Sequence, residues 1–289
     1  MTTPPAQQAS SHAPGSYAPD AYAPDAYVSP IPVRRAHLGD ALASEWTKIR
    51  SVRSTLWTLG VLVLLMVSIG LGVAVLVAAS GVGSESDPAL GLGFFGILPG
   101  SICVITLGVL TIASEYGTGM IRTTLTACPS RGRVLAAKSI VFFLLVFAIT
   151  TVTATLVALA QYAMVGGPVP SAGAWLRASV GVGLYVALLG LLSLAVGAII
   201  RHSAGAITIM IGVLLLPLVA GLFMFTESLR GLQEALFMYA VPSQMIALYA
   251  DVPPFGAGGP SGWEPVLILF GVTGLALGAA YAAMRAQDV

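Results

Sequence analysis

Six long apolar stretches that contain no Asp, Glu, Lys or Arg constrain the fold of this chain more than any other feature. They cover residues 54–84, 88–114, 139–176, 178–200, 203–226 and 265–284. A helix that crosses a bilayer needs ~20 predominantly apolar residues, and every stretch is long enough. We therefore predict an all-α polytopic membrane protein, with spans at about residues 56–79, 90–113, 139–164, 177–200, 205–225 and 265–284.

Positive charge is distributed unevenly between these spans. A chain that crosses six times places alternate connecting segments on opposite sides, and eleven of its 13 Lys and Arg residues fall on one side. Only Arg177 and Arg230 fall on the other side. Because segments rich in Lys and Arg stay in the cytoplasm, we predict that both termini are cytoplasmic.

The composition excludes several classes of protein. Only 9% of the residues are charged, against ~25% in soluble domains. The basic residues lie in short segments at the ends of spans instead of forming one basic face, so we expect no nucleic-acid partner. The two cysteines, Cys103 in a span and Cys128 in a cytoplasmic segment, favour neither a disulfide nor a metal site.

The first 35 residues carry a Tyr-Ala-Pro-Asp repeat, and this segment cannot bury enough apolar surface to form a core. We predict a disordered cytoplasmic tail over residues 1–35. We divide the remainder into an amphipathic helical segment over residues 36–55 and a membrane domain over residues 56–289.

The segment before the first span has the pattern of an amphipathic helix. Its apolar residues recur at helical spacing on one face: Leu38, Leu42, Trp46 and Ile49. Glu45 and Lys48 lie on the opposite face, at the i, i+3 spacing of an ion pair. We expect this helix in the cytoplasmic membrane interface, with Lys48, Arg50 and Arg53 at lipid phosphates. The alternative is that it simply begins the first span.

No predicted span carries an ionisable residue near its middle, which disfavours an ion-coupled carrier. The most polar span is the third, with four threonines and Gln161. Two interpretations remain open: the hydroxyls bond to their own backbone carbonyls, or Thr151, Thr155 and Gln161 line a translocation path. Residues 132–139 resemble a phosphate-binding loop, but Ala137 replaces its second glycine, so we expect no nucleotide binding by this chain.

The cytoplasmic segment between the second and third spans is the most informative one. Glu115 closes the second span, Gly117 and Gly119 interrupt the helix, and Thr118 is a candidate cap for a new one. We predict a short helix over residues 120–127, lying across the membrane face. Such a helix between two spans would act as a lever for a partner that presses on it.

These residues also carry a resemblance to a known family. Glu115, Gly117 and Thr118, followed by Arg122, Leu125, a Pro-Ser-Arg turn ending at Arg131, and Lys138, resemble the membrane subunit of ABC transporters of the type II exporter class. Ser44–Lys48 is similar to the entry helix of that family. The resemblance covers residues 38–289, although the turn lacks an extra residue found in some relatives.

The resemblance implies a permease without catalytic residues or a cofactor of its own. It would pair with a second permease subunit, identical or different, in the lipid bilayer of the plasma membrane, and with ATP-binding cassette subunits that bind ATP and Mg²⁺. The bias toward Ala, Gly and Val indicates a bacterial genome rich in G and C. The expected contacts with the ATPase are Glu115, Gly117, Thr118, Met120, Arg122, Leu125, Arg131 and Lys138. The apolar spans favour an amphiphilic cargo to be exported. A non-transporting membrane anchor or immunity protein is the alternative, and a channel is a third.

Overall fold

The computed structural model describes residues 37–81, 89–128, 130–250 and 258–286. Within these ranges all regular elements are helical, and six helices are long and apolar enough to cross a membrane. The prediction of an all-α protein with six spans is confirmed. The predicted tail over residues 1–35 and the Pro129 turn lie outside the described residues.

The limits of the spans differ somewhat from the predicted ones. The six are α2 (Arg53–Ser80), α3 (Gly93–Gly117) after the 3-10 turn η1 (Ala89–Leu92), α5 (Arg131–Val165), α7 (Val182–Ile200), α8 (Ser203–Leu222) and α11 (Glu264–Ala286). The helix α6 (Ala172–Leu176) and the π-helical turn η2 (Arg177–Gly181) continue into α7. The largest difference is at α5, which extends back to Arg131 because Arg131–Lys138 continues the helix as basic turns outside the apolar stretch.

Helix α7 is the most buried span and packs against α3, α5, α8 and α11. Glycines allow its backbone to approach neighbouring helices closely. A Cβ atom on Gly108 of α3 would overlap the carbonyl oxygen of Gly190 in α7. A Cβ atom on Gly96 would lie 2.6 Å from the Met66 carbonyl oxygen in α2. Small residues therefore set the distances between helices, as is common in membranes.

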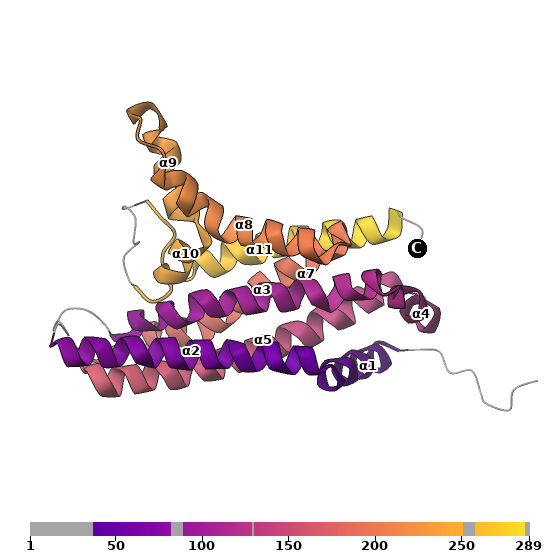
Figure 1. Cartoon of the computed structure of the whole chain (residues 1–289), viewed down its shortest axis with the longest axis horizontal. Coiled ribbons are helices and arrows are strands. Elements are labelled where there is room, and N and C mark those ends of the chain that lie inside the picture. Colours follow the sequence, from indigo (N-terminus) through magenta and orange to yellow (C-terminus); the bar gives the residue numbers. More distant parts are fainter. Residues whose placement is uncertain (1–36, 82–88, 129, 251–257, 287–289) are drawn as a thin grey trace, which may run out of the picture. The chain divides into compact units, whose positions relative to one another are not determined.

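The described chain between α8 and α11 first projects from the bundle and then returns to it (Figure 1). It contains η3 (Glu227–Leu229), α9 (Arg230–Tyr239) and α10 (Val241–Ala247). Gln233 of α9 donates to the Gly221 carbonyl of α8 at 2.8 Å. Most of α10 is buried, and Pro242 occupies its first turn, where a missing N–H costs nothing. Residues 240–249 are mostly buried, whereas residues 230–239 are exposed or partly buried.

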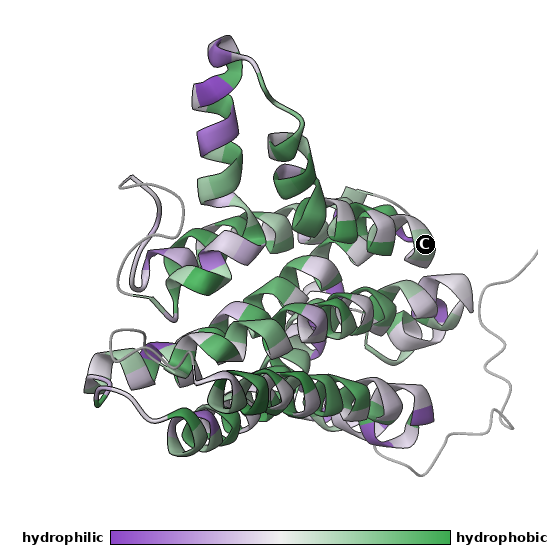
Figure 2. Ribbon diagram, turned by 60° about the vertical axis from the view of Figure 1, so that its left-hand side comes forward, coloured by the Kyte–Doolittle hydropathy of each residue, from purple (hydrophilic) through white to green (hydrophobic). Residues whose placement is uncertain are grey.

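Two groups of short elements mark opposite ends of the spans. Figure 1 shows α1, α4 and the C-terminal end of α11 at one end, and α9 and α10 at the other. Hydrophobic residues run along the long helices, and hydrophilic residues gather near their ends and on α9 (Figure 2). The end that carries α1 and α4 holds the candidate site.

Candidate functional site

The helix before the first span is a separate element. Helix α1 (Leu38–Ser51) ends at an extended residue, Val52, before α2 begins at Arg53. Its charged face is directed inward, because Glu45 is only 4% exposed, whereas Leu38 and Trp46 of its apolar face are exposed. This orientation is the reverse of that in a soluble bundle, and it leaves the apolar face available to lipid.

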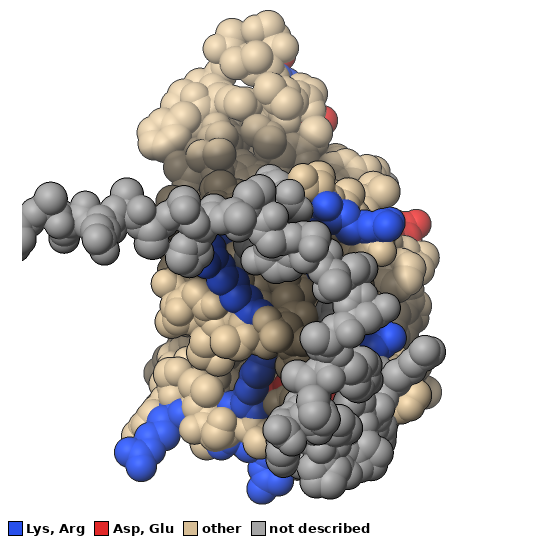
Figure 3. Space-filling model, turned by 90° about the vertical axis from the view of Figure 1, so that its right-hand side faces the viewer, with Lys and Arg blue, Asp and Glu red and all other residues tan. Residues whose placement is uncertain are grey.

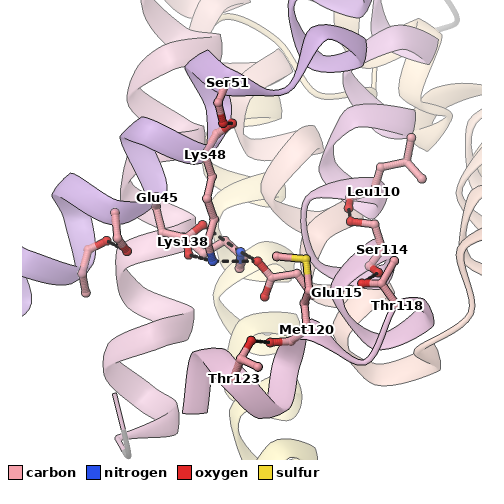
Figure 4. Close-up of polar contacts among 12 residues, drawn as sticks. Glu45, Lys48, Ser51, Leu110, Ser114, Glu115, Thr118, Met120, Thr123 and Lys138 are labelled. Atoms are coloured by element: carbon pink, nitrogen blue, oxygen red, sulfur yellow. Dashed lines mark hydrogen bonds and ion pairs between the residues drawn. The ribbon is translucent and has the colours of Figure 1, made fainter. Parts of the chain in front are cut away.

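Four charged side chains from three helices form a cluster inside this end of the protein, which we call the ion cluster: Glu45 and Lys48 of α1, Glu115 of α3 and Lys138 of α5 (Figure 4). Lys138 Nζ donates to Glu45 Oε2 and Glu115 Oε1, each at 2.8 Å. Lys48 Nζ donates to Glu45 Oε1 at 2.8 Å and to Glu115 Oε1 at 2.9 Å. The predicted Glu45–Lys48 pair is confirmed, but it belongs to this larger network.

The ion cluster is balanced in charge and mostly removed from water. Lys138 is 2% exposed and Glu115 is 6% exposed, and an unpaired charge at such a position is costly. Burial by itself lowers the pKa of Lys48, but hydrogen bonds to Glu45 and Glu115 and their charges outweigh it and raise the pKa. Lys48 therefore stays protonated at neutral pH, and its contribution to stability is lost only when the pH rises through that raised pKa. Its ammonium lies in the ion cluster, and its contact with lipid phosphates stays a prediction.

Helix α4 (Met120–Ala127) connects α3 to α5 and matches the predicted short helix. Its N-cap is Gly119, at φ 73°, in the left-handed region that favours glycine. The sequence predicts Thr118 as the cap, but its hydroxyl donates instead to the Ser114 carbonyl at 2.8 Å. Ile121 faces inward and is buried, whereas Arg122 is exposed. Helix α4 therefore exposes Met120 and Arg122, while Ile121 packs against the bundle.

Two further contacts connect the same end of the spans. The Arg131 guanidinium, at the start of α5, donates to the carbonyl of Met284 near the end of α11. The Arg201 guanidinium, in the turn between α7 and α8, lies 4.9 Å from the centre of the Tyr116 ring in α3. Such cation–π contacts contribute about 0.5–1 kcal/mol when exposed and more when desolvated. Figure 3 shows this end, where Lys and Arg side chains are spread over the visible face.

The residues predicted to contact an ATPase fall into two groups. Gly117, Thr118, Met120 and Arg122 are exposed, and Leu125 and Arg131 are partly buried. Glu115 and Lys138 do not fit that prediction, because both side chains are buried in the ion cluster. Their partnership, and that of Tyr116 with Arg201, was missed, since nothing in the sequence spacing indicates contacts between separate helices.

The polar side chains of α5 mostly bond to backbone. Thr150 donates to the Val146 carbonyl at 2.6 Å, and Thr155 donates to the Thr151 carbonyl at 2.7 Å. Gln161 is completely buried and donates to the Gly70 carbonyl of α2 at 2.9 Å. Gln161 therefore joins two helices in this structure and does not line a path. Thr151 packs against Gly183 of α7, so its expected role in a path gains no support.

The fold and this site together define a multi-pass membrane protein with a short crosswise helix between its second and third spans and a separate helix before the first span. The family model described as "ABC-2 family transporter protein" matches residues 41–217, more than half of the chain. The chain therefore belongs to the ABC-2 transporter family. It is a permease component of an ABC transporter, and its family implies association with an ATP-binding subunit. The match includes α4 and all four residues of the ion cluster. A search of curated proteins found no match.

Proposed function

We propose that α4 is the surface through which a separate ATPase subunit drives this permease. The observation that carries the proposal is the position of α4, which directly connects α3 and α5 next to the ion cluster. Met120 and Arg122 provide an apolar and a basic contact on its exposed surface. The ATPase would bind ATP and Mg²⁺, and this chain would contribute no catalytic group.

The ion cluster would transmit the movement of α4 to the other helices. Lys138 lies near the start of α5 and Glu115 near the end of α3, so a displacement of α4 acts on both residues. Glu45 and Lys48 extend the connection to α1. Closure of two ATPase subunits would then tilt the spans together, and two facing permease subunits would alternate access for an amphiphilic cargo leaving a bacterial plasma membrane.

The docking surface is tested by reversing one charge on α4. Arg122→Glu should reduce co-purification with the cognate ATPase by about tenfold or more, because a reversed interface charge costs about 1.4 kcal/mol or more. The matched control is Arg230→Glu, at the opposite end of the spans and also exposed. Affinity purification after co-expression measures both. Unchanged recovery of the ATPase with Arg122→Glu would refute docking at this surface.

The orientation of the spans is tested by cysteine labelling in a variant without Cys103 and Cys128. Thr126→Cys on α4 should react with a membrane-impermeant maleimide only after the cells are opened. Ser228→Cys in η3, which is also exposed, should react in intact cells. The expectation rests on the excess of Lys and Arg at the α4 end. Labelling of Thr126→Cys in intact cells would invert the proposed topology.

Transport by the complex distinguishes a permease that moves cargo from a membrane anchor. Reconstitution with the ATPase in proteoliposomes should give cargo movement or cargo-stimulated ATP hydrolysis, both reduced by Arg122→Glu. A complex that forms but hydrolyses ATP at the same rate with every cargo offered would favour the anchor.

A further inference from the structure

Helix α9 runs across the spans at the end opposite α4. In Figure 1 the long helices lie across the page, whereas α9 rises steeply from them. Figure 2, which is turned about the vertical axis, shows α9 rising in the same direction. Because the two views agree, α9 lies along the surface of the membrane that the spans cross, near one face of the bilayer.

Helix α9 has three different sides. The first packs against α8, where Gln233 donates to the Gly221 carbonyl and a Cβ atom on Gly221 would lie 2.9 Å from the Phe237 ring. The second is charged and exposed, and there Arg230 Nε donates to Glu234 Oε1 at 3.1 Å. Helical periodicity places the third side opposite that ion pair. We call it the apolar stripe, and it consists of Leu229, Leu232, Leu236 and Tyr239.

The described part of the chain leaves the apolar stripe largely uncovered. Leu232 is 52% exposed and Tyr239 is 54% exposed. The connection from α8 into this region is apolar and exposed as well, with Phe223 at 74% and Phe225 at 86%. Apolar surface costs free energy in water in proportion to its area, and several large side chains contribute here. Hydrocarbon or another protein therefore has to cover this surface.

The polar and apolar sides of α9 are ordered along the direction of the spans. Figure 2 shows hydrophilic residues along the left-hand side of α9, which faces away from the end that carries α1 and α4, and hydrophobic residues along its right-hand side. A helix in a membrane interface needs this order, with its polar side toward water and its apolar side toward the middle of the bilayer. A contact with a second copy of the chain would not require it.

We propose that α9 is an interfacial helix whose apolar stripe binds the lipid surface at the end of the spans opposite α4. The contact is hydrophobic and not electrostatic, because residues 226–239 contain two Glu and only one Arg. An interfacial helix that selects anionic lipid is rich in Lys and Arg instead. Since Gln233 and Phe237 join α9 to α8, the lipid contact holds this end of α8 at a fixed depth. The inference holds whether or not α4 docks an ATPase.

Two positions on opposite sides of α9 test the proposal. Leu232→Cys and Glu234→Cys, both at exposed positions, are made in a variant without Cys103 and Cys128, and a fluorophore is attached to each. The full chain is placed in nanodiscs of phosphatidylcholine. A quencher carried on the lipid acyl chain should quench the label at residue 232 at least about threefold more than the label at residue 234. Aqueous iodide should quench them in the reverse order.

The other outcomes contradict the proposal. Equal access of iodide to both labels would place the apolar stripe in water. Protection of the label at residue 232 from both quenchers would mean that protein covers the stripe, as a second copy of the chain would. Nanodiscs that also contain anionic lipid should give the same quenching, and a marked increase at residue 232 would indicate an electrostatic contact instead.

A photoreactive side chain gives a second measurement that keeps both native cysteines, and it decides the matter even if the cysteine-free variant does not fold. Leu232→benzoylphenylalanine should form an adduct with the mass of one phospholipid after irradiation in lipid vesicles. The matched control, Glu234→benzoylphenylalanine, should form little or none, because its side chain lies on the polar side of α9. A cross-linked dimer of the chain from residue 232, without a lipid adduct, would overturn the proposal.

Discussion

Lys138→Met is expected to destabilise the protein by about 3–5 kcal/mol, since removal of one partner from a buried ion pair leaves an uncompensated charge. Lys138 is 2% exposed and bonds to both Glu45 and Glu115. Without its ammonium, two buried carboxylates share only Lys48. The melting temperature of the purified protein in detergent measures the loss.

A second substitution separates lost charge balance from lost packing. Adding Glu115→Gln to Lys138→Met leaves one carboxylate and one lysine, so the double variant should be more stable than Lys138→Met alone. Arg50→Met, at an exposed position of α1, controls for the substitution itself and should change stability by no more than about 0.5 kcal/mol. If the Lys138→Met variant has the same melting temperature as the unmodified protein, the ion cluster does not hold α1, α3 and α5 together.

Gly108→Ala is expected to destabilise the contact between α3 and α7 by roughly 1–3 kcal/mol through overpacking. The new Cβ atom would overlap the Gly190 carbonyl oxygen and lie 3.1 Å from the Ser193 Cβ atom. A backbone oxygen cannot rotate away as a flexible side chain does, so the helices themselves must separate. Both melting temperature and yield of folded protein should fall.

Gly212→Ala is the matched control, because a Cβ atom at Gly212 in α8 meets nothing within 4 Å. The same substitution there should be neutral or stabilise by up to about 1 kcal/mol, since alanine favours a helix more than glycine does. The two variants should therefore differ in sign. Equal effects would mean that helix propensity, and not the close approach of α3 and α7, determines the cost at Gly108.

The glycines of α7 show how much the spacing of small residues in the sequence predicts about helix packing. Gly183, Gly190 and Gly197 recur at seven-residue spacing, which predicts one packing face. All three lie against neighbouring helices in the structure, with Gly190 against Phe142 and Val104. Three glycines of α11 also have small-residue spacing, yet a Cβ atom added at any of them would meet nothing within 4 Å: Gly271, Gly274 and Gly278. Spacing alone therefore does not distinguish a packed stripe from an open one.

The sequence by itself determined the six spans, the short helix between the second and third, and the side that carries the positive charge. Each of these follows from a local property: the cost of charge in hydrocarbon, the length of an apolar stretch, or glycines that interrupt a helix. Only the tertiary structure decided that Glu45, Glu115 and Lys138 meet, that Glu45 faces inward from α1, and that Gln161 bonds to α2. Those contacts depend on how each helix is rotated about its axis, and close packing at pairs such as Gly108 and Gly190 sets that rotation.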